Sequence, residues 1–286
     1  MPRPLFCWLL LVCAASAGGC GTEPPAVADP PAPPAPAPGA FDPTACGTIT
    51  GLVTWTGPEP TVPPVQAFTP RPDGPGLASR TVPLANAPRI DHFTRAVAGA
   101  VVYLREVDVA RARPWDLPNV EVEFRDSQIV VKQGDRTGRT GFVKRGDAIT
   151  ARSAEPTFHV LRARGAAFFA LPFPDPDRPL TRTLDKCGRV ELTSAAGCYW
   201  QAADLFACDH PYYAVSDAEG RFHFASVPEG RYDLVAWHPN WVVTRTERNP
   251  ETGQPSRLIY APPLETSRPA SVSRGGKTLA NLTLPK

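Results

Sequence analysis

The stretch "YAVSDAEGRFHFASVPEGRYDLVAWHP" (213–239) decides the fold class, because it holds three strand-like runs separated by two turn signals. Phe222 and Phe224 flank the polar His223, and this period of two places alternate side chains on one face of a strand. The segments "DAEG" and "VPEG" carry Asp, Pro and Gly at positions that β-turns prefer. The stretch therefore predicts consecutive strands joined by tight turns.

The rest of the chain favours the same fold class. The sequence has 286 residues, of which 36 are Pro, and each Pro removes a backbone donor and fixes φ, which disfavours helices. We find no convincing helix longer than two turns. Further strand-like runs are "GTITGLVTW" (47–55), "VAGAVVYLREV" (97–107), "VEVEFRDSQIVVKQG" (120–134), "GFVKRGDAITARS" (141–153) and "KTLANLTLPK" (277–286). The sequence predicts an all-β protein of the sandwich type.

The N-terminus indicates export. "MPRPLFCWLLLVCAASAGGC" combines an Arg, an apolar run too short to span a bilayer and a cluster of small residues before Cys20. "AGGC" resembles a bacterial lipobox, which implies removal of 1–19 and lipidation of Cys20; the alternative is ordinary cleavage after "ASA". Residues 20–45 form a Pro/Ala-rich tether. We expect a lipid-anchored protein of the bacterial envelope, on the outer membrane, facing the periplasm or the surface.

The charge distribution argues against a nucleic-acid partner. The formal net charge is +2, and Lys and Arg are scattered rather than gathered into a basic face. The partners that we expect are the membrane, through the N-terminal lipid, and an envelope protein or a glycan.

Two distant segments resemble one known domain. "GTITGLVTW…VAGAVVYLREV" resembles the first half of a carboxypeptidase regulatory-like (transthyretin-like) β-sandwich, and 213–239 resembles its second half. About 100 residues separate the two halves, which suggests an inserted domain. This resemblance implies a sandwich built from 46–117 and 206–286, with an insert at 118–205.

The insert resembles a cupredoxin, through "FVKRGDAITARSAEPTFHVLRARG" (142–165) and "GCYWQAAD" (197–204). The combined order resembles a group of secreted bacterial proteins described as methylamine-utilisation-like. The resemblance implies that His159 takes the place of a copper-binding His and Cys198 that of the thiolate. Gln201 stands at the second His position and about Asp204 at the Met position, and His210 is a candidate replacement.

A type 1 copper site needs two imidazoles and a thiolate. Because Gln201 is not an imidazole, we expect a degenerate metal site and no cofactor, with copper binding for electron transfer as the alternative.

Four cysteines remain after the signal and the lipidation site. Four cysteines in an exported chain most often form two disulfides, here with three pairings open. A bond from Cys198 to one of the others would also occupy its sulfur. The candidate disulfide cysteines are Cys46, Cys187, Cys198 and Cys208.

No catalytic motif is found: the sequence has no G-x-S-x-G, no HExxH and no phosphate-binding glycine loop. Trp237 and Trp241 lie four residues apart at a predicted strand end, where aromatic rings would stack on sugars or pack into the core. We therefore expect a non-enzymatic binding or scaffolding protein. The alternatives are a periplasmic copper or electron-transfer protein and a carbohydrate-binding module.

Overall fold

The computed structural model describes residues 39–71 and 74–284, and it confirms the predicted all-β class. Within these residues the only helical element is the 3-10 turn η1 (Pro43–Ala45), and every other regular element is a strand. A helix able to cross a membrane is not found among these residues. The predicted signal peptide, Cys20 and most of the tether lie outside them.

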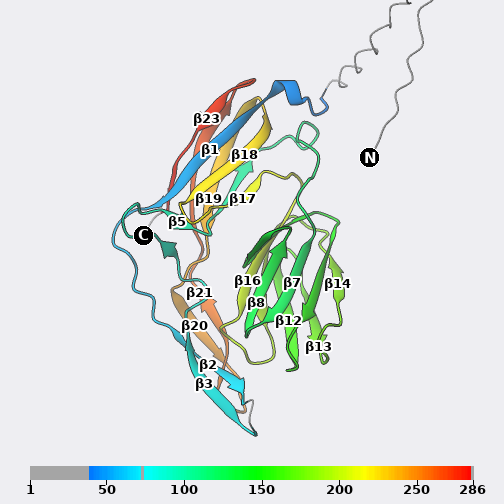
Figure 1. The fold of residues 1–286 in the computed structure, drawn as a ribbon, viewed down its shortest axis with the longest axis vertical. Coiled ribbons are helices and arrows are strands. Elements are labelled where there is room, and N and C mark those ends of the chain that lie inside the picture. Colours follow the sequence, from blue (N-terminus) through cyan, green and yellow to red (C-terminus); the bar gives the residue numbers. More distant parts are fainter. Residues whose placement is uncertain (1–38, 72–73, 285–286) are drawn as a thin grey trace, which may run out of the picture. The chain divides into compact units, whose positions relative to one another are not determined.

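Residues from both ends of the described chain build an outer β-sandwich (Figure 1). One sheet has the order β18-β1-β23, with β24 also pairing with β1, and the other has the order β17-β6-β19-β22. The strands are β1 (Cys46–Trp55), β6 (Val101–Arg105), β17 (Tyr213–Val215), β18 (Arg221–Pro228), β19 (Gly230–His238), β22 (Leu264–Val272), β23 (Lys277–Leu279) and β24 (Leu282–Leu284). Strands β1 and β6 therefore meet β18 and β19 although they are far apart in the sequence.

The alternation in these strands fills one core between the two sheets. Ile49 and Val53 of β1, Phe224 of β18 and Leu234 of β19 are almost completely buried in the same apolar cluster. His223, between the two Phe residues, is exposed. Burial of large apolar side chains stabilises the fold by about 1.5–3 kcal/mol each, so this shared core holds the two halves together.

The predicted turn at 217–220 has the geometry that its residues favour. The Asp217 carboxylate accepts hydrogen bonds from the backbone N–H groups of Glu219 (3.0 Å) and Arg221 (2.7 Å). Gly220 has φ +74°, and a Cβ there would lie 2.6 Å from the Val53 carbonyl oxygen. Glycine is therefore required both by its backbone angle and by the close approach of β1.

The chain between β6 and β17 forms a second β-sandwich. Its two five-stranded sheets have the orders β10-β16-β15-β12-β13 and β14-β11-β7-β8-β9, and within the described residues these strands pair only with one another. The strands are β7 (Val120–Arg125), β8 (Gln128–Gln133), β9 (Arg136–Gly138), β10 (Thr140–Lys144), β11 (Ala148–Ser153), β12 (His159–Gly165), β13 (Phe169–Phe173), β14 (Leu180–Thr183), β15 (Gly188–Ser194) and β16 (Ala202–Cys208). Strand β16 thus runs across the boundary expected at 205/206. The second sandwich has its own apolar core.

Three two-stranded hairpins lie outside the sandwich sheets. They are β2 (Val65–Pro70) with β3 (Leu77–Val82), β4 (Arg89–Ile90) with β5 (Val97–Ala98), and β20 (Val243–Arg248) with β21 (Pro255–Tyr260). The Pro-rich segment 56–96 therefore contains strands that its sequence does not reveal.

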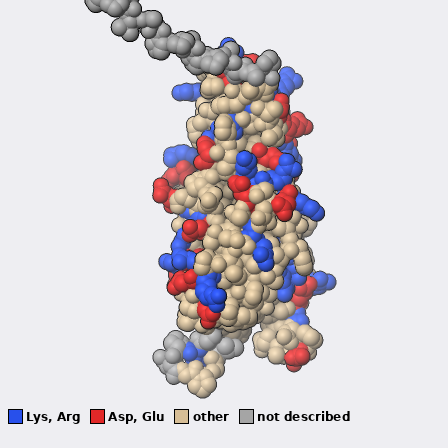
Figure 2. All heavy atoms as spheres, turned by 90° about the vertical axis from the view of Figure 1, so that its right-hand side faces the viewer, with Lys and Arg blue, Asp and Glu red and all other residues tan. Residues whose placement is uncertain are grey.

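An aromatic cluster joins the two sandwiches. The ring of Phe206, on β16 of the inserted sandwich, meets the ring of Trp237, on β19 of the outer sandwich, edge to face at 5.1 Å. Tyr213 stacks on Tyr103 at 5.1 Å in the same cluster. On the face seen in Figure 2, acidic and basic side chains are interspersed rather than separated into patches.

Candidate functional site

His159 is the first residue of β12 and is only 3% exposed. Its Nε2 lies 2.7 Å from the Glu155 carboxylate and 3.0 Å from the Thr157 hydroxyl, and the Phe124 ring stacks on the imidazole with centroids 4.4 Å apart. The hydrogen bond to His159 lowers the pKa of Glu155, against the effect of burial. The Nδ1 atom is buried without a hydrogen-bond partner among the described residues.

Cys198 lies in the connection between β15 and β16, within electrostatic range of Glu155, the carboxylate that bonds His159. Burial raises the pKa of its thiol to about 11, a hydrogen bond with Ser194 acts in the opposite direction, and the charge of nearby Glu155 adds to the rise. Cys198 and His159 therefore share Glu155 as a neighbour. A metal bound here would have to displace the thiol proton, because the thiolate is the metal-binding form.

Gln201 is completely buried, and its backbone N–H donates to the Cys198 carbonyl oxygen at 3.0 Å. Neither its amide oxygen nor its amide nitrogen has a hydrogen-bond partner among the described residues. The structure thus brings the loop of Cys198 and Gln201 to the side of the sandwich where Glu155 holds His159.

This donor set does not fit type 1 copper, which requires two imidazoles. The part of the chain that the structure describes holds no group of three or more His, Cys, Asp or Glu side chains arranged to bind a metal. His210 does not supply the second imidazole, because it follows the last residue of β16, whereas the loop of Cys198 and Gln201 precedes the first. The His210 ring instead stacks on Tyr213, with centroids 5.3 Å apart. Asp204, at the predicted Met position, is paired with Arg189.

The disulfides expected from the cysteine count are not formed, because all four described cysteines are free thiols. The Cys46 thiol donates to the Asp42 carbonyl oxygen and the Cys208 thiol to the Phe206 carbonyl oxygen, both at 3.1 Å. Cys46 begins β1 of the outer sandwich, and Cys198 lies in the connection that precedes β16. Cys187 and Cys208 flank the pair Gly188 and Ala207 on the neighbouring strands β15 and β16, and both thiols are free.

Of the two tryptophans proposed for sugar stacking, Trp237 is buried and Trp241 is partly exposed. Trp237 is 5% exposed, with Phe206 against its ring and the Arg189 guanidinium 5.1 Å from its centroid. Trp241 is partly buried against the outer core, 5.6 Å from the ring of Trp55. The expectation of a sugar platform at Trp237 is therefore wrong, because the inserted sandwich covers that ring.

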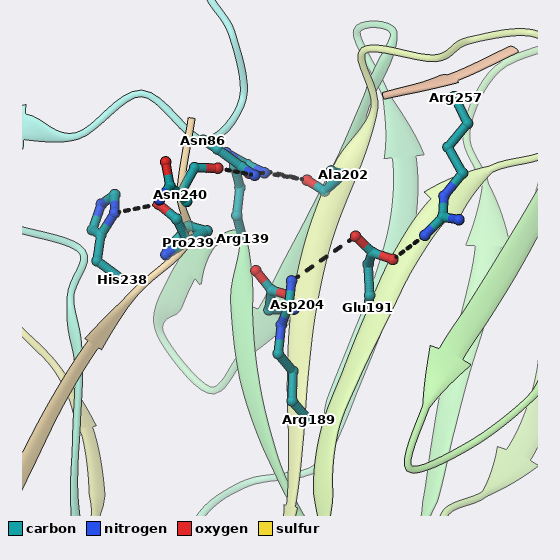
Figure 3. A network of polar contacts seen from close by, with 10 residues as sticks. All are labelled: Asn86, Arg139, Arg189, Glu191, Ala202, Asp204, His238, Pro239, Asn240 and Arg257. Atoms are coloured by element: carbon teal, nitrogen blue, oxygen red, sulfur yellow. Dashed lines mark hydrogen bonds and ion pairs between the residues drawn. The ribbon is translucent and has the colours of Figure 1, made fainter. Parts of the chain in front are cut away.

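Figure 3 shows a polar network that the sequence did not reveal. Its Arg189 is the guanidinium that lies over the Trp237 ring. The Arg189 guanidinium bonds Asp204 Oδ1 through Nε and Nη2, both at 2.7 Å. Glu191 lies between Arg189 (4.0 Å) and Arg257 (2.7 Å). Burial raises the pKa of the Asp204 carboxyl, with Arg189 acting in the opposite direction.

Arg139 belongs to the same network but contacts neutral oxygens. Its guanidinium donates to the Ala202 carbonyl oxygen at 2.6 and 2.8 Å and to the Asn86 side-chain oxygen at 3.3 Å. The Asn86 amide in turn donates to the Asn240 carbonyl oxygen at 3.0 Å. The sequence carries one signal of this network: Arg189 and Glu191 alternate with apolar residues along β15 and so point away from the core. Their partners lie in other segments, so the sequence does not identify them.

Comparisons with known proteins give a single structural similarity to report. No protein-family model matches the chain, and no curated protein matches it. Among solved structures, an oxidised point mutant of amicyanin is similar, with 14% sequence identity and a TM-score of 0.25. The match covers 37% of this chain and 98% of the amicyanin chain.

Proposed function

We propose that this chain is a non-enzymatic, lipid-anchored protein of a bacterial cell envelope with a binding or scaffolding role. The lipobox-like "AGGC" before Cys20 and the Pro/Ala-rich segment that follows support export and tethering. A tether of this composition is extended, so it would hold the folded part away from the membrane surface.

The outer sandwich is proposed to be a carboxypeptidase regulatory-like domain. The two sequence segments that carry this resemblance lie about 100 residues apart, and they pair in the outer sandwich: β1 with β18, and β6 with β19. This pairing supports the proposal that they are halves of one domain interrupted by an insert.

The inserted sandwich is proposed to be cupredoxin-like with a degenerate metal site. The observation that carries this proposal is the local environment of His159. Its Nε2 is held by Glu155 at 2.7 Å, and Gln201 occupies the position at which the resemblance calls for a second imidazole. With one imidazole where type 1 copper needs two, the module serves as a structural or binding unit.

The test is an anaerobic titration of the full, mature protein with Cu(I) and, separately, Cu(II). We expect no intense thiolate-to-copper absorption band. We also expect that any copper binding will be weak and will persist in the Cys198→Ser and His159→Ala variants. Such a band, lost in both variants, would establish the electron-transfer alternative instead. Cys187→Ser, which removes an exposed thiol, is the matched control for adventitious copper binding.

A further inference from the structure

A cleft of about 250 Å³ opens beside the polar network, and none of its lining residues belongs to the His159 cluster. Arg189 and Glu191 of β15 and Arg257 and Tyr260 of β21 line the cleft. The rest of the lining is the apolar Pro239, Ile259, Ala261, Pro262 and Pro263, with the amides of Asn86 and Asn240. Small-molecule sites commonly combine an apolar wall with a few convergent polar groups in this way.

The network around the cleft carries one positive charge more than its carboxylates neutralise. It contains three guanidinium groups, of Arg139, Arg189 and Arg257, and two carboxylates, of Asp204 and Glu191, which leaves 3 − 2 = +1. Arg189 and Arg257 each contact a carboxylate, but Arg139 is bonded to a carbonyl and an amide oxygen. Arg139 does not line the cleft, but Tyr260, which does, is within electrostatic range of its guanidinium. The excess positive charge would therefore stabilise a monoanion bound beside Tyr260.

Two side chains that line the cleft have hydrogen-bond donors with no acceptor among the described residues. Within the described residues Arg257 is bonded only through Nη2, so its Nη1 has no acceptor there; its Nε also lacks an acceptor but is buried. The Tyr260 hydroxyl makes no hydrogen bond in the same part of the chain and lies within electrostatic range of Arg139 and Glu191. Burial raises the pKa of Tyr260 to about 12, so the hydroxyl is a donor at neutral pH.

We propose that this cleft binds one carboxylate group, between Arg257 and Tyr260, with the attached hydrocarbon against the proline-rich wall. Guanidinium groups match the planar, two-oxygen geometry of a carboxylate. The volume restricts the ligand to a small aliphatic acid or to the last residue of a peptide ending in a free carboxylate. This proposal gives a ligand class to the binding role proposed above and rests on that role, but not on the metal site.

The experiment measures binding of sodium butyrate to the full chain by calorimetry at constant ionic strength. Butyramide, which has the same shape without the charge, is the matched ligand control. We expect butyrate to bind and butyramide not to bind. Tyr260→Phe removes one donor and keeps the Arg257–Glu191 pair, so we expect it to weaken binding about five- to tenfold. Arg257→Gln should weaken it at least tenfold.

Arg245→Gln is the control variant, because Arg245 is an exposed cation on the neighbouring strand β20; it should leave butyrate binding unchanged. N-acetylalanine separates the two sources of the carboxylate: tighter binding than butyrate indicates a peptide C-terminus, and weaker binding a free acid. The proposal is overturned if butyrate does not bind, if butyramide binds equally well, or if both variants bind as the parent does. Such a failure would leave the copper titration and the lipid-anchor test untouched, so the two proposals fail separately.

Discussion

The Glu155 carboxylate lies 2.7 Å from Nε2 of His159, four residues further along the chain, and the Phe124 ring covers the imidazole. This contact ties the loop before β12 to the strand itself. It also places an anion, rather than a second imidazole, beside the one histidine of the inserted sandwich.

Glu155→Gln is expected to lower the free energy of unfolding by about 1–3 kcal/mol at pH 7, because it removes a charge-assisted hydrogen bond from a largely buried histidine. The pKa of Glu155 is lowered in the folded state from its ordinary 4.5. Its stabilisation is therefore complete above pH 4.5 and is lost as the pH falls through the folded-state pKa. Urea unfolding at several pH values should show the difference between variant and parent shrinking in acid.

The control for this prediction is Glu59→Gln, because Glu59 pairs with His92 at 3.6 Å on the surface. That pair is exposed, so its loss should change stability by less than about 0.5 kcal/mol. Equal effects of the two substitutions would contradict the structural role of Glu155.

Trp237→Ala is expected to destabilise the protein by about 3–5 kcal/mol, because it removes a large ring from the junction of the two sandwiches. Trp241→Ala, at a partly buried ring on the same part of the chain, should cost clearly less. Both values come from denaturant unfolding followed by circular dichroism. A Trp237 variant as stable as the parent would show that the ring is free, as a sugar-binding role requires.

Gly220→Ala tests the turn that begins β18. The added Cβ would lie 2.6 Å from the Val53 carbonyl oxygen, so β1 and the turn must separate. Gly197→Ala is matched to it, since Gly197 has φ +85° but open space around its Cβ position. We expect about 1–2 kcal/mol of destabilisation at Gly197 from the backbone angle alone and a larger loss at Gly220. Equal losses in thermal unfolding would rule out the steric contact.

Thiol titration tests the free cysteines. Four thiols, those of Cys46, Cys187, Cys198 and Cys208, should react after unfolding in denaturant without reductant. In the native protein Cys187, the exposed one, should react first, although its pKa is raised to about 11, mainly by burial, and this slows the reaction. The early phase should vanish in Cys187→Ser. Fewer than four reactive thiols after unfolding would show that disulfides form in the exported protein.

Cys20→Ala tests the anchor. We expect the parent to fractionate with membranes and to carry a lipid on its N-terminal peptide in mass spectrometry, and the variant to lose both properties. Cys187→Ala is the control, because it removes a cysteine from the folded part without touching the lipobox. Membrane association that persists in the Cys20 variant would favour a different mode of attachment.

The all-β class was predictable because strand alternation and turn chemistry are local. The turn at Asp217 depends on residues within four positions of it, and the alternation around His223 on its immediate neighbours. The segment 56–96 escaped prediction because its short strands are largely exposed and most of its prolines lie in the stretches between them.

The candidate sites were predictable only in part. Resemblance pointed to His159, Cys198 and Gln201, and the structure places Cys198 and His159 around Glu155, which no pattern singled out. The cleft could not be anticipated, since Arg189, Arg257 and Arg139 come from separate segments that meet only after folding.

The sequence by itself determined which runs form strands, where the tight turns fall and which side chains alternate, because these properties depend on residues a few positions apart. Only the tertiary structure decided that Phe206 and Arg189 cover Trp237, that Cys187 and Cys208 come opposite each other on neighbouring strands, and that Arg189 and Arg257 pair with Asp204 and Glu191 while Arg139 does not. Burial and ion pairing depend on contacts between segments far apart in the chain, and packing of the two sandwiches creates those contacts.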